Sequence, residues 1–102
     1  MQSEKNILMI VNPISGDLDK LEIVESALLY CKLKNLQLTT FYTTGKSDAY
    51  EINRLYKKLK PQRVIIVGGD GTVKFVAYIL QAEDVVFGII PAGSANGLSV
   101  DL

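Results

Sequence analysis

Several residue types are scarce in this chain. It contains no histidine and one cysteine, Cys31, and its eleven basic and eleven acidic residues give a formal net charge of zero. Without histidine, the chain lacks the commonest general base at neutral pH and the commonest metal ligand. The lone cysteine cannot pair within the chain, which favours a reducing, cytoplasmic setting. Balanced charge produces no overall field toward nucleic acid, so we expect no nucleic-acid partner.

Long hydrophobic runs are also missing, because no apolar stretch is long enough to span a bilayer. What the chain does contain is the composition of an ordinary globular protein, with 48% hydrophobic and 22% charged residues. At 102 residues it is long enough for one domain with a modest core, and short for an elaborate enzyme. We find no internal repeat, low-complexity tract or linker.

The apolar pattern predicts strands and helices in alternation. Runs of apolar side chains predict buried strands, and apolar residues at helical spacing predict amphipathic helices. The predicted strands are residues 6–11, 36–42, 63–67 and 85–90, and the predicted helices are residues 18–33, 49–59 and 73–80. Such alternation implies right-handed crossovers and helices on both faces of a parallel sheet. The predicted fold class is therefore α/β, a three-layer α/β/α Rossmann-like domain with a mostly parallel sheet of about four strands.

Helical spacing also predicts which side chains face the core. In the first helix these are Leu21, Val24, Leu28 and Cys31, with Ile23 and Ala27 beside them. In the second helix they are Ile52, Leu55, Tyr56 and Leu59. Asp48, followed three residues later by Glu51, predicts a variant of the capping box at the start of the second helix.

The loops that are rich in glycine and polar residues all follow strands. The segments NPISG, TTGKSD, GGDGT and PAGSANG come after the first, second, third and fourth predicted strand, respectively. Because parallel strands end at the same edge of a sheet, we expect these loops to gather where open sheets bind ligands, at a reversal of strand order. The loops after the first and third strands then flank the crevice, which predicts the sheet order 2-1-3-4.

The segment GGDGT has the composition of a phosphate-binding loop. Glycine permits positive φ and lets backbone N–H groups approach a ligand without an intervening Cβ, and amides at a helix N-terminus favour an anion. Gly68, Gly69 and Gly71 fit this role, with Thr72 as a hydroxyl donor or helix cap. Asp70 would repel phosphates unless Mg²⁺, or a substrate hydroxyl awaiting deprotonation, lies between them. Taken alone, the segment fits equally well a turn in which Asp70 merely caps the helix.

The motifs NPISG, GGDGT and PAGSANGL, in this order and spacing, resemble the ATP-binding domain of the diacylglycerol kinase catalytic family. The resemblance extends from Asn6 to the C-terminus. It implies ATP and Mg²⁺ as cofactors, and transfer of the γ-phosphoryl group to the hydroxyl of a lipid such as diacylglycerol or a sphingoid base. GGDGT alone does not separate lipid kinases from NAD kinases, whereas the NPxSG and GSAN segments favour the lipid-kinase branch.

The resemblance also implies which residues form the nucleotide site. In chain order they are Asn12, Pro13, Ser15, Gly16, Thr43, Thr44, Gly68, Gly69, Asp70, Gly71, Thr72, Ser94 and Asn96. Thr44, with Thr43 as the alternate, is implied to contact the nucleotide. Asp70 is implied to be the catalytic residue, needed for activity through Mg²⁺. Ser94 and Asn96 are implied as further polar groups of the site, for which loop capping is the structural alternative.

The chain departs from the family pattern in sequence and in length. Lys74 and Phe75 stand where family members carry Asn and Glu, and Asp17 replaces a common Lys or Arg. Family members also have a second, mostly β domain that supplies much of the lipid pocket and, in bacterial members, the proposed general base. We therefore expect residues 1–102 to be a single nucleotide-binding domain, the N-terminal half of a two-domain lipid kinase whose β-rich domain is absent, with little kinase activity alone.

Partners and the reaction itself stay open at this point. Basic residues near the predicted helix ends fit either peripheral contact with the inner membrane face or a solvated surface; they are Lys32, Lys34, Arg54, Lys57, Lys58 and Lys60. Apolar surface that faces a missing domain would favour self-association. The alternative functions are an NAD kinase-type domain and a non-catalytic regulatory module that keeps the fold, the latter favoured by Lys74 and Phe75.

Overall fold

The computed structural model describes residues 3–13 and 20–91, and the elements alternate as the sequence predicts. The strands are β1 (Ser3–Val11), β2 (Gln37–Tyr42), β3 (Pro61–Gly68) and β4 (Val86–Pro91), and the helices are α1 (Lys20–Leu33), α2 (Asp48–Leu59) and α3 (Asp70–Ile79). Two elements begin three residues earlier than predicted, β1 at Ser3 rather than at Asn6 and α3 at Asp70 rather than at Val73. The last three residues of GGDGT therefore form the first turn of a helix instead of a separate loop.

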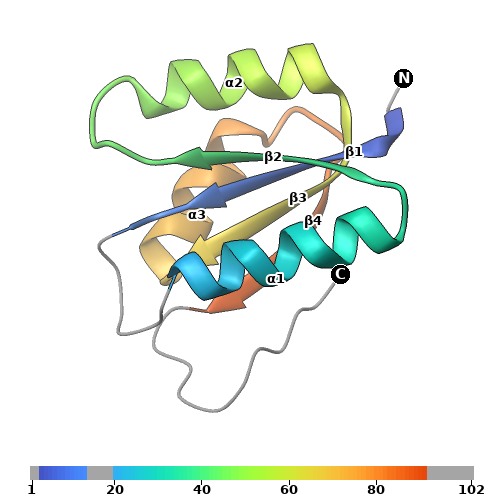
Figure 1. The fold of residues 1–102 in the computed structure, drawn as a ribbon. Coiled ribbons are helices and arrows are strands. Elements are labelled where there is room, and N and C mark those ends of the chain that lie inside the picture. Colours follow the sequence, from blue (N-terminus) through green and yellow to red (C-terminus); the bar gives the residue numbers. More distant parts are fainter. Residues whose placement is uncertain (1–2, 14–19, 92–102) are drawn as a thin grey trace.

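The four strands form one parallel sheet in the predicted order, β2-β1-β3-β4 (Figure 1). Val11 of β1 pairs with Tyr42 of β2 and with Val67 of β3, and Val67 pairs with Ile90 of β4. The carboxyl ends of all four strands therefore lie level at one edge. The strand that follows β1 in the chain lies on one side of the β1–β3 pair, and the strand that follows β3 lies on the other. The strand order therefore reverses between β1 and β3, and the crevice of the fold lies there.

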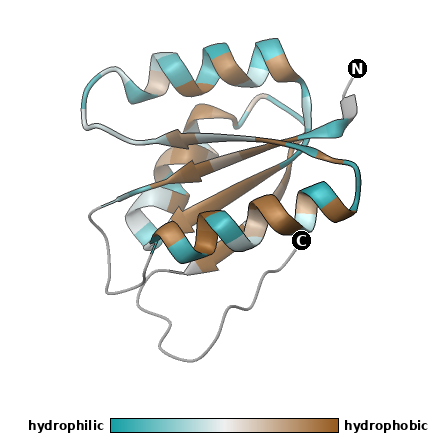
Figure 2. Ribbon diagram, viewed as in Figure 1, coloured by the Kyte–Doolittle hydropathy of each residue, from teal (hydrophilic) through white to brown (hydrophobic). Residues whose placement is uncertain are grey.

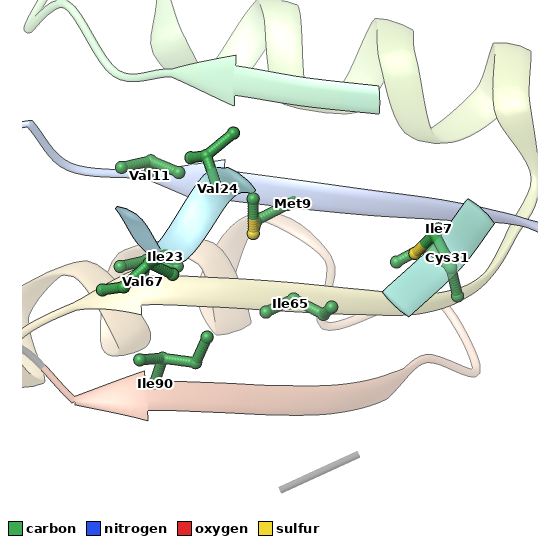
Figure 3. Close-up of a cluster of buried hydrophobic side chains, with 9 residues drawn as sticks. All are labelled: Ile7, Met9, Val11, Ile23, Val24, Cys31, Ile65, Val67 and Ile90. Carbon is green, nitrogen blue, oxygen red and sulfur yellow. The ribbon is translucent and has the colours of Figure 1, made fainter. Parts of the chain in front are cut away.

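Helices cover both faces of the sheet, with α1 on one face and α2 and α3 on the other (Figure 1). This arrangement confirms the three-layer α/β/α fold. Because β1 and β3 are central and covered on both sides, they are apolar along most of their length (Figure 2). Figure 3 shows the core beneath α1, which consists of Ile7, Met9, Val11, Ile23, Val24, Cys31, Ile65, Val67 and Ile90. The core on the other face consists of Leu8, Ile10, Ile52, Tyr56, Val64, Ile66, Val76 and Leu80.

The buried face of α1 differs from the predicted one. Leu21 and Leu28, which were expected to face the core, are 63% and 47% exposed, whereas Ile23 and Val24 are buried with Cys31. Apolar side chains surround most of this helix, so their spacing could not identify the buried face, and contact with the sheet selects it. Burial raises the pKa of the Cys31 thiol, which stays protonated at neutral pH as part of the core.

Gly68 ends β3 and allows α3 to begin close to the strand. A Cβ at position 68 would lie 2.7 Å from Oγ1 and 2.8 Å from Cβ of Thr72, well inside the separation at which packed atoms attract. Thr72 is itself held in place, because Nδ2 of Asn12 donates a hydrogen bond to its Oγ1 at 3.1 Å. The backbone N–H of Asn12 also donates to the carbonyl of Val67 at 2.9 Å. The ends of β1 and β3 and the first turn of α3 are thereby joined.

Asp48 organises the turn between β2 and α2. Its carboxylate accepts hydrogen bonds from the backbone N–H groups of Thr44 and Gly45, both at 2.9 Å, and lies 3.2 Å from the Thr44 hydroxyl. This turn contains two residues in the left-handed region, Gly45 at φ 88° and Ser47 at φ 57°. A serine in that region is strained, so the bonds to Asp48 help to hold a conformation that the backbone does not favour.

The capping box predicted at the start of α2 is wrong. Ser47 is the N-cap residue and makes no side-chain capping bond, and Asp48 lies inside the helix. Glu51 pairs with Arg54 on the exposed surface at 3.0 Å instead of reaching back to the helix start. The carboxylate of Asp48 instead accepts from the amides of Thr44 and Gly45, which belong to the preceding turn and lie outside the helix.

The contact between Gly68 and Thr72 predicts a contrast between two glycines. We expect Gly68→Ala to lower the free energy of unfolding by about 1–3 kcal/mol, because the added methyl group overpacks a buried junction. Gly71→Ala is the matched control, since a Cβ at position 71 meets nothing within 4 Å. In a helix this exchange should raise stability by up to about 1 kcal/mol. Urea denaturation followed by circular dichroism measures both, and equal stability of the two variants would contradict the packing account.

The turn before α2 provides a second prediction. In Asp48→Asn, one acceptor oxygen becomes an amide nitrogen, so we expect the free energy of unfolding to fall by about 1–3 kcal/mol. The amide hydrogens of Thr44 and Gly45 should exchange faster with solvent. Glu51→Gln on the same helix serves as the control and should leave the denaturation midpoint unchanged, because its ion pair is exposed. Unaltered protection of both turn amides in Asp48→Asn would argue against this role.

Candidate functional site

A pocket of about 620 Å³ opens at the carboxyl edge of the sheet, where β1, β2 and β3 end. Three segments of the chain line it, and their lining residues are Asn12 and Pro13, then Thr43, Thr44, Gly45 and Asp48, then Gly69, Gly71, Thr72 and Phe75. Small-molecule sites commonly enclose about 300–1,000 Å³, so the pocket has room for a ligand of nucleotide size. Three of the four loops expected at this edge contribute to it, and the fourth, PAGSANG, lies outside the described residues except for Pro91, which ends β4.

The pocket contains many of the residues predicted for the site. Those that line it are Asn12, Pro13, Thr43, Thr44, Gly69, Gly71 and Thr72. Ser15, Gly16, Ser94 and Asn96 lie outside the described residues. Gly68 and Asp70 are described but are not among the lining residues. The structure thus brings most of the described candidates together, and the contacts of each with a ligand stay predictions.

The glycines that precede and open α3 do not have the backbone conformation expected of them. None of Gly68, Gly69 and Gly71 has a positive φ, and Gly69 is extended at φ −90° and ψ −172°, a conformation that any residue adopts. A Cβ built at Gly69 or at Gly71 meets nothing within 4 Å. Neither backbone strain nor packing within the described residues therefore requires glycine at these two positions. What the missing side chains leave is open space inside the pocket.

The first turn of α3 lies at the pocket and contains backbone amides without a partner in the helix. The first helical hydrogen bond runs from the N–H of Val73 to the carbonyl of Gly69 at 3.1 Å. The amides of Asp70, Gly71 and Thr72 come before it and have no partner within the helix. Together with the helix dipole they form a site that favours an anion. Thr72 adds a hydroxyl, whose oxygen already accepts from Asn12 and whose proton can be donated.

Asp70 lies between two residues that line the pocket and is exposed. The N-cap residue of α3 is Gly69, and within the described part of the chain no side chain makes a capping bond there. The interpretation of Asp70 as a helix cap is therefore not supported. Its carboxylate remains accessible beside the amides that favour an anion.

Sequence reasoning missed three residues of the pocket. Gly45 and Asp48 belong to the turn after β2, where the acidic residue had been interpreted as part of a capping box. Phe75 had been recorded only as a departure from a family pattern, yet it lines the pocket and is 40% exposed. An aromatic residue one helical turn after a glycine-rich start is the signal that could have identified it.

The basic residues near the helix ends lie away from this pocket. The helices run antiparallel to the strands (Figure 1), so the C-terminal ends of α1 and α2 lie at the amino edge of the sheet. Lys32, Lys57 and Lys58 are in the last turns of these helices. Arg54 pairs with Glu51, and Nζ of Lys34 lies 5.9 Å from the ring centre of Tyr30. Among the helices described here, none is long and apolar enough to cross a membrane.

The sequence matches known kinases over most of its length. Human diacylglycerol kinase iota is 31% identical over 99 residues, an alignment that covers 93% of this chain and 9% of that protein. The diacylglycerol kinase of Mycobacterium tuberculosis (strain ATCC 25618 / H37Rv) is 26% identical over 90 residues, covering 88% of this chain and 29% of that protein. This chain thus spans less than a third of the length of either relative.

Comparison of the fold with solved structures also identifies diacylglycerol kinases. The crystal structure of a diacylglycerol kinase from Bacillus anthracis str. Sterne superposes with a TM-score of 0.69 at 26% sequence identity, covering 94% of this chain and 36% of that one. The family model described as "Diacylglycerol kinase catalytic domain" matches residues 6–102. With nearly the whole chain matched, and with the fold and the loop order in agreement, the chain belongs to the diacylglycerol kinase catalytic domain family.

Proposed function

We propose that the pocket binds ATP with Mg²⁺, and that the chain is the nucleotide-binding part of a lipid kinase. In this proposal the γ-phosphoryl group of ATP is transferred to the free hydroxyl of a lipid. The observation that carries it is the first turn of α3, which lines a pocket of about 620 Å³ in a member of a kinase family and has amides left over from the helix.

The phosphates would occupy the part of the pocket closest to Gly69 and Gly71. Both residues line the pocket, and both have open space where a Cβ would stand. A phosphate oxygen could therefore approach the amides of the first turn without displacing protein atoms. Asn12 and Thr72 bridge the ends of β1 and β3 immediately beside these amides, which fixes the geometry of the site before the ligand binds.

The residues present fit a magnesium ion that is shared with the phosphates. Among the described residues, no cluster of three or more acidic, cysteine or histidine side chains could hold a metal alone. Mg²⁺ in kinases needs less, because it is commonly bound by one or two carboxylates together with substrate phosphates and water. Asp70 is the exposed carboxylate between the lining glycines, and it would hold the ion. When bound, the ion would neutralise charge on the transferred phosphoryl group.

The acceptor proposed here is a lipid with a free hydroxyl, such as diacylglycerol or a sphingoid base. The names of the relatives favour a lipid over NAD as acceptor. In this proposal the described residues bind the nucleotide, and we assign the lipid pocket and the general base to a further, β-rich domain, as the sequence resemblance implies. Transfer requires both substrates to be held together, so we expect the 102 residues to bind nucleotide without phosphorylating lipid.

Membrane contact of the parent kinase would not run through the basic residues near the helix ends. These residues lie at the amino edge of the sheet, whereas the pocket lies at the carboxyl edge. A bilayer bound by Lys57 and Lys58 would face the side of the domain farthest from the nucleotide. We therefore assign these lysines to the solvated surface, where cations complement the helix C-termini.

Calorimetric titration of the chain with Mg-ATP tests the proposal. We expect saturable binding by the unmodified chain, and a loss of affinity of about tenfold or more in Gly71→Ala, because a Cβ would fill space needed by a phosphate. The same variant is expected to be at least as stable as the unmodified chain, so a folding defect cannot explain its loss. Absence of binding by the unmodified chain would refute nucleotide binding. Full affinity in Gly71→Ala would show that the phosphates do not bind beside Gly71.

Asp70→Asn separates a metal-holding role from a structural one. With Mg²⁺ present, we expect the affinity for ATP to fall, because the ion loses its protein ligand. With Mg²⁺ removed by a chelator, the affinity should rise, because the repulsion between carboxylate and phosphates is gone. Glu83→Gln removes an equal charge from an exposed loop and should change neither value. A parallel fall under both conditions would show that Asp70 acts without the metal.

A further inference from the structure

Phe75 differs from the other phenylalanines of the chain in where it lies. The chain has three, and Phe41 and Phe87 pack against the core beneath α2 and α3. Phe75 belongs to neither core cluster, is 40% exposed and lines the pocket. Exposing a phenyl ring in a pocket whose other side chains are mostly small or polar leaves apolar surface in water, which is unfavourable unless a ligand covers it.

Phe75 lies on the same face of α3 as the pocket-lining residues of its first turn. Phe75 is four residues after Gly71 and three after Thr72, so the three residues share one face of the helix. Side chains of a helix lean toward its N-terminus, which brings the ring back toward the first turn. Since a Cβ at Gly71 would meet nothing within 4 Å, the ring does not rest on that glycine, and space remains between them.

The opposite wall of the pocket comes from the turn after β2. Thr43, Thr44 and Gly45 line it, and the backbone N–H groups of Thr44 and Gly45 are already bonded to Asp48. Those two amides are therefore not available to bind the polar edge of a ligand. The chemistry of the pocket then changes along α3, from free amides at the helix start to an aromatic residue whose Cα lies about 6 Å from that of Gly71 along the axis.

We infer that Phe75 stacks on the base of the bound nucleotide, an inference that rests on the proposed function. A nucleoside triphosphate complements the pocket, because it has an anionic chain at one end for the amides and a flat aromatic ring at the other for Phe75. Stacking uses the face of a base rather than its hydrogen-bonding edge, so it is tolerant of base identity. Phe75 thus contributes affinity for ATP and GTP alike, and the amides of α3 contribute affinity for the phosphates.

The experiment compares Mg-ATP with magnesium tripolyphosphate, which carries the phosphates without the base. In Phe75→Ala we expect the affinity for ATP to fall about tenfold, as alanine exchange of a base-stacking aromatic does, and the affinity for tripolyphosphate to stay unchanged. Phe75→Trp should retain the affinity for ATP. Tyr78→Ala is the control, because Tyr78 is an aromatic residue of the same helix that is 71% exposed and does not line the pocket.

Phe75→Trp also supplies a direct signal of stacking. The chain has no tryptophan, so the emission of this variant reports on position 75 alone. ATP and GTP should both quench the emission, and tripolyphosphate should not.

Two results would overturn the inference. One is an equal loss of affinity for ATP and tripolyphosphate in Phe75→Ala, which would assign Phe75 to the general shape of the pocket. The other is undiminished ATP affinity in Phe75→Ala, which would leave the ring to contact a lipid chain or another protein surface. Failure of the unmodified chain to bind either ligand is a different outcome, because it overturns the proposed function itself.

Discussion

The contact between Gly68 and Thr72 determines how α3 leaves β3, and the pocket depends on it. With no side chain on Gly68, the first turn of the helix approaches the strand so closely that a Cβ would lie 2.7 Å from Oγ1 of Thr72. Asn12, at the end of β1, completes the junction through its bond to that oxygen. The parallel pairing of β1 and β3 places the two chain ends side by side, so one small junction sets the position of the amides that face the pocket.

The chemistry of the pocket depends on which of its backbone amides are already hydrogen-bonded within the protein and which can still bind a ligand. In the turn after β2, the backbone N–H groups of Thr44 and Gly45 donate to the carboxylate of Asp48. These bonds fix the wall of the pocket but leave two fewer donors for a ligand. The start of α3 keeps its donors, because the first intrahelical bond begins only at Val73. An anion is therefore favoured at one wall and not at the other. The exposed ring of Phe75, one turn into α3, makes the rest of that wall aromatic.

The sequence was sufficient to predict the sheet and the edge at which the pocket lies. Runs such as residues 64–67 of β3 are apolar because both faces of the strand are covered. Such a run can be recognised from the sequence alone, without knowing which elements pack against the strand. The buried face of α1 could not be predicted, since Leu21 and Leu28 are as apolar as the residues that the sheet selects. Asp48 and Phe75 were missed for a related reason. Their roles depend on neighbours from other segments, which local spacing does not reveal.

Nucleotide binding, as proposed, depends on the amides at the start of α3, which would hold the phosphates of ATP. Backbone amide spectra of the isotope-labelled chain, recorded while Mg-ATP is added, test it most directly. We expect the largest shifts at Asp70, Gly71 and Thr72, smaller ones at Thr43 and Thr44, and none at the C-terminal ends of α1 and α2. Shifts concentrated at those helix ends, or unperturbed amides from Gly69 to Thr72 at millimolar Mg-ATP, would contradict it.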